Sequence, residues 1–356
     1  REGLGATLIN DDFDVNQPYE VPKRTKTNNN LPFPYGNLEP KDTVFSNIDY
    51  KKLNNVVANA FDEKEQKNKR TRAVIVIYKD KIIAEKYDDG FNKNSRILGW
   101  SMTKSITGTL FGILQKQGKF DINKPAPIAE WQKDERAIIR TSDLLHMNSG
   151  LEWEEKYDKI CDATKMLFQA EDMGKVQLEK RAQFPPNLHW NYSSGTTNLL
   201  SKILRNQFKT HKEYLDFWYS NLLDKIGMNS AIIETDMAGN FVGSSYGWAT
   251  ARDWAKFGLL YLHKGNWNGE QLFDESWVKY VSTPTNTSNG NYGAQFWLNA
   301  GGKFPDVPRN MYYASGFQGQ MVAIFPSQDL VIVRMGLSEE FDFNGLLRGV
   351  VSSLKK

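Results

Sequence analysis

Cysteine and histidine are scarce in this chain of 356 residues. Its one cysteine, Cys161, excludes an intramolecular disulfide and a cysteine-rich metal cluster, and we expect it to be a small buried apolar residue. The four histidines have none of the spacings typical of metal ligands, and His146 is expected to form a structural hydrogen bond. A glycine-rich phosphate loop is also missing. The sequence therefore predicts neither a metal nor another cofactor.

Long apolar runs and an excess of one charge are missing as well. No run approaches the roughly 20 apolar residues that span a bilayer, so the sequence predicts no membrane span. The chain has 45 basic and 42 acidic residues, a net charge of +3, and lacks the one-sided field that nucleic-acid binding needs. Because the chain begins at Arg1 rather than methionine, we expect a periplasmic or secreted location if a leader was removed, and a cytoplasmic one otherwise.

Strand-like patterns stand near both ends of the chain. Residues 72–87 read as a hairpin, with β-branched runs on either side of a turn at Lys79–Lys81. Four later segments also read as successive strands, with a tight turn before the last one: 292–300, 311–316, 320–326 and 330–336. One antiparallel sheet built from both ends of the chain would place these strands together.

Helix-like periodicity fills much of the remainder. Apolar residues recur at spacings of three and four over 53–61, 102–114 and 343–354, and two further helices are expected within 196–208 and 249–265. The sequence thus predicts an α+β fold: an antiparallel sheet flanked by helices, plus an inserted helical lobe. We expect an extended N-terminal arm at 1–46, a sheet domain from 47–99 and 247–356, and a mainly helical lobe at 100–246 that carries the nucleophile.

A serine and a lysine three residues apart open the predicted helix at 102–114. Side chains at i and i+3 lie on one face of a helix, so Ser101 and Lys104 are expected to meet. A serine hydroxyl needs an adjacent base to become a nucleophile, and apolar neighbours lower the pKa of a lysine so that it can act as one. Ser-x-x-Lys is common by chance, however, and a solvated lysine is the alternative for this motif alone.

Two further stretches add candidate groups. Tyr192 precedes a predicted helix, and a phenol beside a lysine can relay a proton to a leaving group, although a packed aromatic residue is the alternative. Ser194 is a candidate for orienting substrate or, alternatively, the cap of that helix. Ser315 and Gly316 lie in a predicted strand where glycine allows close approach to a ligand, unless they form a bulge or turn.

The ordered set of Ser101-x-x-Lys104, Tyr192-x-Ser194 and Ser315-Gly316 resembles the serine β-lactamase and penicillin-binding-protein superfamily. The tyrosine version is similar to class C β-lactamases and related esterases, peptidases and amidases. Within that group, "WSMTKS" together with "NYSSGTTNLLS" most resembles the 6-aminohexanoate-dimer hydrolases, which cleave small linear amides and esters. The resemblance runs from about residue 48 to the C-terminus and implies a β-lactamase/DD-peptidase-like fold.

The resemblance also implies roles for individual residues. Ser101, Lys104 and Tyr192 would be catalytic, and the backbone N–H groups of Ser101 and Phe317 would form the oxyanion hole. Candidates for contact with substrate are Ser194, Ser315, Gly316 and Trp100, the last lining the acyl pocket with Trp153 and Trp190. The sequence does not decide which of the lysine and the tyrosine is the general base, because coupled groups titrate together.

The sequence departs from the family pattern at Ala314. In the family, this position carries a lysine that helps to bind the carboxylate of β-lactams and D-Ala-D-Ala peptides. A hydrogen bond to a charged group is worth roughly 1.5–3 kcal/mol, so its loss argues against efficient β-lactam hydrolysis. We therefore expect a serine hydrolase that cleaves small esters or linear amides. The alternatives are a DD-peptidase or weak β-lactamase and, from another class, a non-hydrolytic penicillin-recognising or peptidoglycan-binding module.

Overall fold

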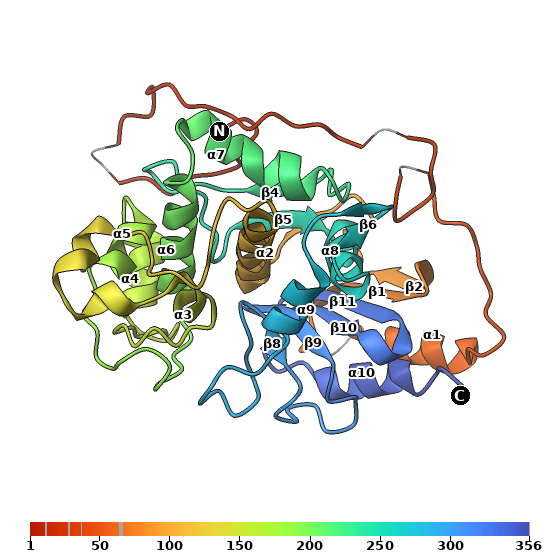
Figure 1. Ribbon diagram of the computed structural model, residues 1–356. Coiled ribbons are helices and arrows are strands. Elements are labelled where there is room, and N and C mark those ends of the chain that lie inside the picture. Colours follow the sequence, from red (N-terminus) through yellow and green to blue (C-terminus); the bar gives the residue numbers. More distant parts are fainter. Residues whose placement is uncertain (11–12, 28, 37, 64–66, 356) are drawn as a thin grey trace.

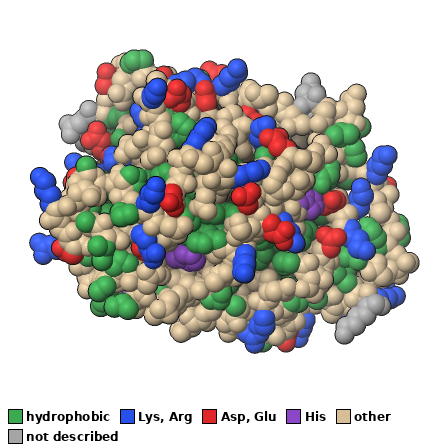
Figure 2. All heavy atoms as spheres, viewed as in Figure 1, with side chains coloured by type: hydrophobic (Ala, Val, Ile, Leu, Met, Phe, Trp, Pro, Cys, Tyr) green, Lys and Arg blue, Asp and Glu red, His purple; other side chains and the backbone are tan. Residues whose placement is uncertain are grey.

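The fold was analysed in a computed structural model, which describes residues 1–10, 13–27, 29–36, 38–63 and 67–355. Four positions of the predicted N-terminal arm, 11, 12, 28 and 37, therefore lie outside the described residues. Figure 1 shows the arrangement: a sheet with helices on both faces, a helical lobe beside it, and the arm running across the top of both. On the face drawn in Figure 2, acidic and basic side chains are interspersed.

Strands from the two ends of the chain form one antiparallel sheet, as predicted. Its strand order is β2-β1-β11-β10-β9-β8. The N-terminal hairpin supplies β1 (Thr71–Tyr78) and β2 (Lys81–Tyr87), and the remaining strands are β8 (Trp297–Leu298), β9 (Tyr312–Gly316), β10 (Gln320–Phe325) and β11 (Leu330–Gly336). Strand β1 pairs with β11, with Ile75 opposite Val333, which joins the two ends of the chain at the middle of the sheet.

Apolar side chains cover both faces of this sheet. Along β1, Ala73, Ile75 and Ile77 belong to one buried cluster, while Val74 and Val76 belong to the other. Successive side chains of a strand point to opposite faces, so a strand buried on both faces reads as a continuous apolar run. This explains why the β-branched run of the hairpin is the clearest strand pattern in the sequence.

Helices from different parts of the chain pack on the two faces. Helices α1 (Tyr50–Asn59) and α10 (Phe343–Val351) contact each other beneath the sheet, and α8 (Ala251–Leu262) packs against β10 and β11 on the opposite face (Figure 1). Helix α1 begins after Asp49, whose side chain accepts a hydrogen bond from the N–H of Lys52. A helix also covers 103–116, where the sequence predicts one: this is α2 (Thr103–Lys116), which lies between the sheet and the lobe.

The lobe consists of short helices joined by long irregular segments. Its helices are α3 (Thr141–Leu145), α4 (Asp162–Gln169), α5 (Met173–Leu178), α6 (Ser194–Arg205) and α7 (His211–Trp218), followed by a turn of π-helix, η4 (Tyr219–Leu223). The lobe also contains two 3-10 turns, η2 (Ala129–Lys133) and η3 (Glu135–Ile138), whereas a third, η5 (Pro326–Gln328), joins β10 to β11.

Two small sheets accompany the large one, with strand orders β3-β5-β4 and β6-β7. Their strands are β3 (Arg96–Leu98), β4 (Ile232–Ile233), β5 (Gly247–Thr250), β6 (Asn266–Trp267) and β7 (Glu270–Gln271). The limits of the three predicted parts of the chain stay a prediction.

One predicted strand is wrong over most of its length. The segment 292–300 forms only the two-residue strand β8, preceded by an irregular stretch that follows α9 (Glu275–Val281). The backbone of Gln295 has a φ of 60°, in the left-handed region, which interrupts an extended run. The side chain of Gln295 instead donates to the carbonyl of Leu145 and accepts from Thr197, so its polar atoms tie the lobe to this end of the sheet.

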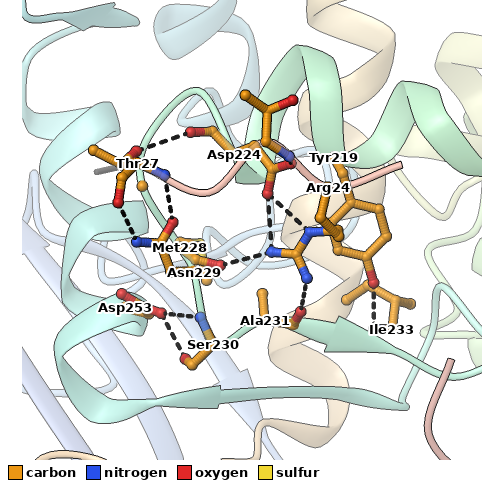
Figure 3. Close-up of polar contacts among 12 residues, drawn as sticks. Arg24, Thr27, Tyr219, Asp224, Met228, Asn229, Ser230, Ala231, Ile233 and Asp253 are labelled. Carbon is orange, nitrogen blue, oxygen red and sulfur yellow. Dashed lines mark hydrogen bonds and ion pairs between the residues drawn. The ribbon is translucent and has the colours of Figure 1, made fainter. Parts of the chain in front are cut away.

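The arm is fastened to the lobe through Arg24. Its guanidinium donates to Asp224 at 2.9 Å and to the carbonyl of Ala231 at 2.9 Å, and it lies 4.1 Å from the ring centroid of Tyr219. Figure 3 shows these contacts together with a reciprocal pair of hydrogen bonds, both of 3.0 Å, between the backbone of Thr27 and the side-chain amide of Asn229. At Arg24 and Thr27 the arm is held on the body by polar contacts, and Leu4 and Phe33 of the same segment are buried in the main apolar cluster.

Two sequence predictions about single residues are confirmed in this fold. Cys161 is buried at the start of α4, where its thiol donates to the carbonyl of Lys156. His146 shares a 2.7 Å hydrogen bond with the hydroxyl of Thr285, and burial lowers its pKa from 6.5 to about 4. No described helix has the length and apolar character needed to cross a membrane.

Candidate active site

Ser101 lies in a tight turn directly before the long buried helix. It is the middle residue of the 3-10 turn η1 (Trp100–Met102), which continues into α2. Trp100 has a φ of 48°, a left-handed conformation that costs a non-glycine residue on the order of 1–3 kcal/mol. The hydroxyl of Thr103 holds this turn, because it donates to the carbonyl of Trp100 at 2.8 Å and accepts from the N–H of Gly247 at 3.0 Å.

Lys104 is buried inside the protein and points at Ser101. Its side chain is 1% exposed, and its Nζ lies 2.9 Å from the Oγ of Ser101, 2.9 Å from the Oγ of Ser194 and 2.9 Å from the carbonyl oxygen of Ser244. Burial lowers the pKa of Lys104 from 10.5 to about 8, and the negative charge of Glu155 opposes that change. A substantial fraction of this lysine is therefore neutral near pH 8, as a base requires.

Tyr192 comes to the same point from the loop before α6. Its phenol is close enough to the side chain of Ser101 to influence its pKa, and Lys104 Nζ lies 4.9 Å from the centroid of its ring. Burial and the negative charge of Glu155 raise the pKa of Tyr192 well above its usual value. The loop is held by Asn191, whose N–H donates to Met147 and whose side-chain amide donates to the carbonyl of Trp153. The structure therefore brings Ser101, Lys104 and Tyr192 together.

Ser194 lies elsewhere than expected. It is not the helix cap, because Ser193 caps α6 through a 2.9 Å hydrogen bond from the N–H of Thr196. The side chain of Ser194 is fully buried, and its hydroxyl sits between Lys104 and Glu155, 2.7 Å from a carboxylate oxygen of the latter. Its predicted contact with substrate stays a prediction. The geometry instead makes Ser194 a partner of Lys104.

Glu155 is the residue that sequence reasoning missed. Its carboxylate accepts from the N–H and the hydroxyl of Ser194, from Nε1 of Trp153 at 2.8 Å and from the hydroxyl of Tyr157 at 2.7 Å. The three residues Trp153, Glu155 and Tyr157 alternate along an irregular segment. In an extended chain, residues two apart lie on one side, so the spacing in "WEEKY" was a signal that could have drawn attention to this group.

The end of strand β9 reaches the segment just before Ser101 by close backbone contact. A Cβ on Gly316 would lie 2.1 Å from the carbonyl oxygen of Gly99, so only glycine fits there. The ring of Phe317 lies 5.6 Å from that of Trp100, measured between centroids, while the oxyanion role of the Phe317 N–H stays a prediction. Ser315, Gly316 and Phe317 also line a pocket of about 470 Å³, together with Lys303, Phe304 and Phe343.

The three candidate tryptophans have different surroundings. Trp100 packs against Phe317 and Tyr246, next to the nucleophile. Trp153 is buried, and its Nε1 donates a hydrogen bond to Glu155. Trp190 packs against Tyr292 and Trp297, and Trp297 in turn contacts the ring of Tyr192 at 5.1 Å between centroids. Of the three tryptophans, Trp100 is the one that lies directly beside Ser101, in the same turn.

Chemically, this arrangement is suited to acyl transfer. A serine hydroxyl hydrogen-bonded to a lysine of lowered pKa is an activated nucleophile, and a phenol of raised pKa beside it is a proton donor. Among the residues that the structure describes, no cluster of three or more His, Cys, Asp or Glu side chains is placed to hold a metal ion.

The chain matches the model of the family described as Beta-lactamase over residues 57–343. A curated relative, the 6-aminohexanoate-dimer hydrolase of Paenarthrobacter ureafaciens, is 24% identical over 321 residues, which are 80% of this chain and 78% of that protein. Among solved structures, a family VIII carboxylesterase superposes with a TM-score of 0.69 at 14% identity, covering 89% of this chain and 100% of that one. A D-stereospecific amidohydrolase from Streptomyces has a TM-score of 0.62 at 12% identity, covering 85% and 98%. The predicted β-lactamase-like α+β fold is thereby confirmed.

Proposed function

The chain belongs to the beta-lactamase family, and on that premise we propose that it is a serine hydrolase that cleaves small esters or linear amides through an acyl-enzyme on Ser101. One observation carries the proposal: the buried amine of Lys104, whose pKa burial lowers to about 8, lies 2.9 Å from the hydroxyl of Ser101. An ordinary surface lysine would stay charged at neutral pH and could not accept the serine proton.

In the proposed first step, neutral Lys104 takes the proton of Ser101 while Oγ attacks the carbonyl carbon of the substrate. The negative charge that develops on the carbonyl oxygen is stabilised by the backbone N–H groups of Ser101 and Phe317. As the tetrahedral intermediate collapses, the bond to the leaving group breaks and the Tyr192 phenol protonates the departing oxygen or nitrogen. Lys104 returns its proton to Tyr192.

In the second step, water replaces the leaving group. Lys104 accepts a proton from the attacking water, the acid product departs, and the same proton returns to the oxygen of Ser101. One water molecule is consumed in each cycle, and all three side chains regain their starting protonation. The pKa shifts support this division of roles, since burial lowers the pKa of Lys104 and raises that of Tyr192. Lys104 is therefore the group that can be neutral and accept a proton near pH 8, whereas Tyr192 stays protonated and has a proton to give.

Several features support the substrate class. Ala314, a buried apolar residue, stands where β-lactam-binding relatives carry a lysine, so the strand offers no cation to a substrate carboxylate at that position. The curated relative is a 6-aminohexanoate-dimer hydrolase, and the similar folds include a carboxylesterase and an amidohydrolase. The curated relative and the alanine at position 314 support an esterase or amidase rather than a DD-peptidase.

The direct test is Ser101→Ala. Turnover of p-nitrophenyl butyrate should fall to the background rate, because the nucleophile is gone, while the circular dichroism spectrum and the melting temperature stay close to those of the wild type. A variant that keeps more than about a tenth of the wild-type activity would reject Ser101 as the nucleophile.

A panel of substrates tests the class. We expect the short ester and the linear dimer of 6-aminohexanoate to be hydrolysed with higher kcat/KM than nitrocefin and a D-Ala-D-Ala peptide. Preference for the last two would favour a β-lactamase or DD-peptidase. A lasting covalent adduct on Ser101 without turnover of any of the four would favour a penicillin-recognising module.

A further inference from the structure

Besides Ser101, two oxygen atoms lie within hydrogen-bond distance of the amine of Lys104. The carbonyl oxygen of Ser244 can only accept, and it lies 2.9 Å from Nζ. The hydroxyl of Ser194 lies at the same distance, but a hydroxyl can either donate or accept, so its direction depends on its other partner. That partner is Glu155, 2.7 Å away.

Glu155 is placed to hold that hydroxyl in one direction. Its Oε2 accepts from two groups that can only donate, the N–H of Ser194 at 2.6 Å and Nε1 of Trp153 at 2.8 Å. An ionised carboxylate has no hydrogen to give, so the hydroxyl of Ser194 must donate to Oε1 and accept from Lys104.

Counting hydrogens on Lys104 then gives a consequence for catalysis. As an ammonium ion, it has three hydrogens for its three neighbours, including Ser101. As a neutral amine it has two hydrogens and one lone pair. Both hydrogens are drawn to the oxygens of Ser194 and Ser244, because neither can donate to nitrogen. The lone pair is left pointing at Ser101, from which a base must take its proton.

We propose that Glu155 is a positioning residue that, through the hydroxyl of Ser194, aims the lone pair of neutral Lys104 at the hydroxyl of Ser101. This inference rests on the proposed serine hydrolase function. It assigns Ser194 to the support of the base rather than to substrate. Glu155 itself touches neither the nucleophile nor a reacting atom of the proposed mechanism.

The charged and titratable groups around this network are few. Glu155 and the Tyr192 ring face Lys104, while Tyr157 faces Glu155 from its own segment. The ring of Tyr292 packs against that of Tyr192. Burial raises the pKa of Tyr292 well above its usual value, and the negative charge of Glu155 adds to this rise. The negative charge of Glu155 raises the pKa of Lys104, so removing the charge should lower that pKa further.

The test is the pH dependence of kcat/KM for p-nitrophenyl butyrate in Glu155→Gln. An amide in place of the carboxylate can donate to Ser194 and so release the fixed direction of its hydroxyl. We expect the plateau value to fall by about 10- to 100-fold, as for other misaligned catalytic groups, and the midpoint of the acid limb to move to lower pH. A purely structural residue would lower the plateau without moving this midpoint.

Two further variants sharpen the test. Ser194→Ala should lower the plateau to a similar extent, and the double variant should be no worse than Ser194→Ala alone, because Glu155 acts through that hydroxyl. The matched control is Glu154→Gln, which removes the neighbouring carboxylate, partly exposed and paired with Lys159, and should leave the profile unchanged.

The outcomes separate the inference from the proposed function. A plateau within about threefold of wild type in Glu155→Gln, or a fall with an unmoved midpoint, overturns the positioning role. Should that variant fail to fold, Ser194→Ala decides: a folded protein with a wild-type plateau overturns the role, and a lowered plateau supports it. A wild-type protein that hydrolyses no ester or amide would instead reject the proposed function.

Discussion

A buried lysine is the residue on which the chemistry of this site depends. Lys104 has lost its contact with water, and its amine is surrounded by two serine hydroxyls, one carbonyl and the ring of Tyr192. Desolvation disfavours the charged form, while Glu155 limits how far the pKa falls. The balance leaves a group whose pKa of about 8 is close to working pH, as general base catalysis favours.

The pH dependence of the reaction follows from this pKa. We expect kcat/KM for p-nitrophenyl butyrate to rise with pH and to reach half of its plateau near pH 8, because only neutral Lys104 can accept the serine proton. Well below this midpoint, the value should fall about tenfold per pH unit. Rates corrected for spontaneous ester hydrolysis between pH 5.5 and 9 would show this, and an optimum near pH 4 would contradict it.

The same pKa also has a consequence for stability. The unfolded chain holds the Lys104 proton up to about pH 10.5, whereas the folded protein releases it near pH 8. Between these values the unfolded state binds more protons, so the contribution of Lys104 to the free energy of unfolding rises with pH. Below about pH 8, the folded protein carries a buried charge at a cost.

At the scale of elements, the site is a meeting of three separate segments. The turn η1 supplies Ser101, the loop before α6 supplies Tyr192, and the end of β9 supplies Gly316. Gly316 lies against the backbone before Ser101, because the space where its side chain would be is filled by the carbonyl oxygen of Gly99. This contact fixes the end of β9 against the residues that directly precede Ser101.

Gly316→Ala tests that contact. Its Cβ would lie 2.1 Å from a backbone oxygen, which cannot rotate away, so the end of β9 must move from the turn that carries Ser101. We expect kcat/KM to fall by roughly 100-fold, since displacement of about 1 Å has effects of this size. Thermal unfolding measured in parallel shows whether the sheet survives. Wild-type activity in the variant would mean that β9 does not take part in the site.

The sequence predicted the five longest helices and the strands of the large sheet because their patterns are local. The apolar run of β1 and the periodicity of α2 each follow from the faces that those elements bury. The segment at 292–300 was predicted as a strand from its composition, but Gln295 adopts a left-handed backbone to reach Leu145 and Thr197 in the lobe. A contact with residues about 100 to 150 positions away cannot be read from a local pattern.

At the scale of the whole molecule, the arm runs from the N-terminus beside α7 across the top of the molecule to α1 (Figure 1). Arg24 is one of its polar anchors: the pair with Asp224 is mostly shielded from water, with side-chain exposures of 18% and 4%. The arm is therefore part of the folded body at this point rather than a free tail (Figure 3).

Removal of this anchor should destabilise the protein. Arg24→Ala leaves Asp224 buried with the N–H of Thr25 as its remaining donor, and we expect a loss of roughly 2–4 kcal/mol in the free energy of unfolding. Urea unfolding measures the loss, and limited proteolysis should cut the arm sooner. The matched control is Lys26→Ala, which removes an exposed cation from the same segment. A loss below about 0.5 kcal/mol for Arg24→Ala would show that the arm contributes little to stability.

The sequence by itself determined the longest helices, most strands of the large sheet and the pair of Ser101 and Lys104, because helix geometry fixes which residues at i and i+3 meet. It also suggested Tyr192 through the ordered set of motifs. Only the tertiary structure decided that Ser194 supports the lysine and that Glu155 holds Ser194. The reason is physical: a carboxylate 39 positions before its partner acts through distance and direction in space, and neither is encoded in any short stretch of residues.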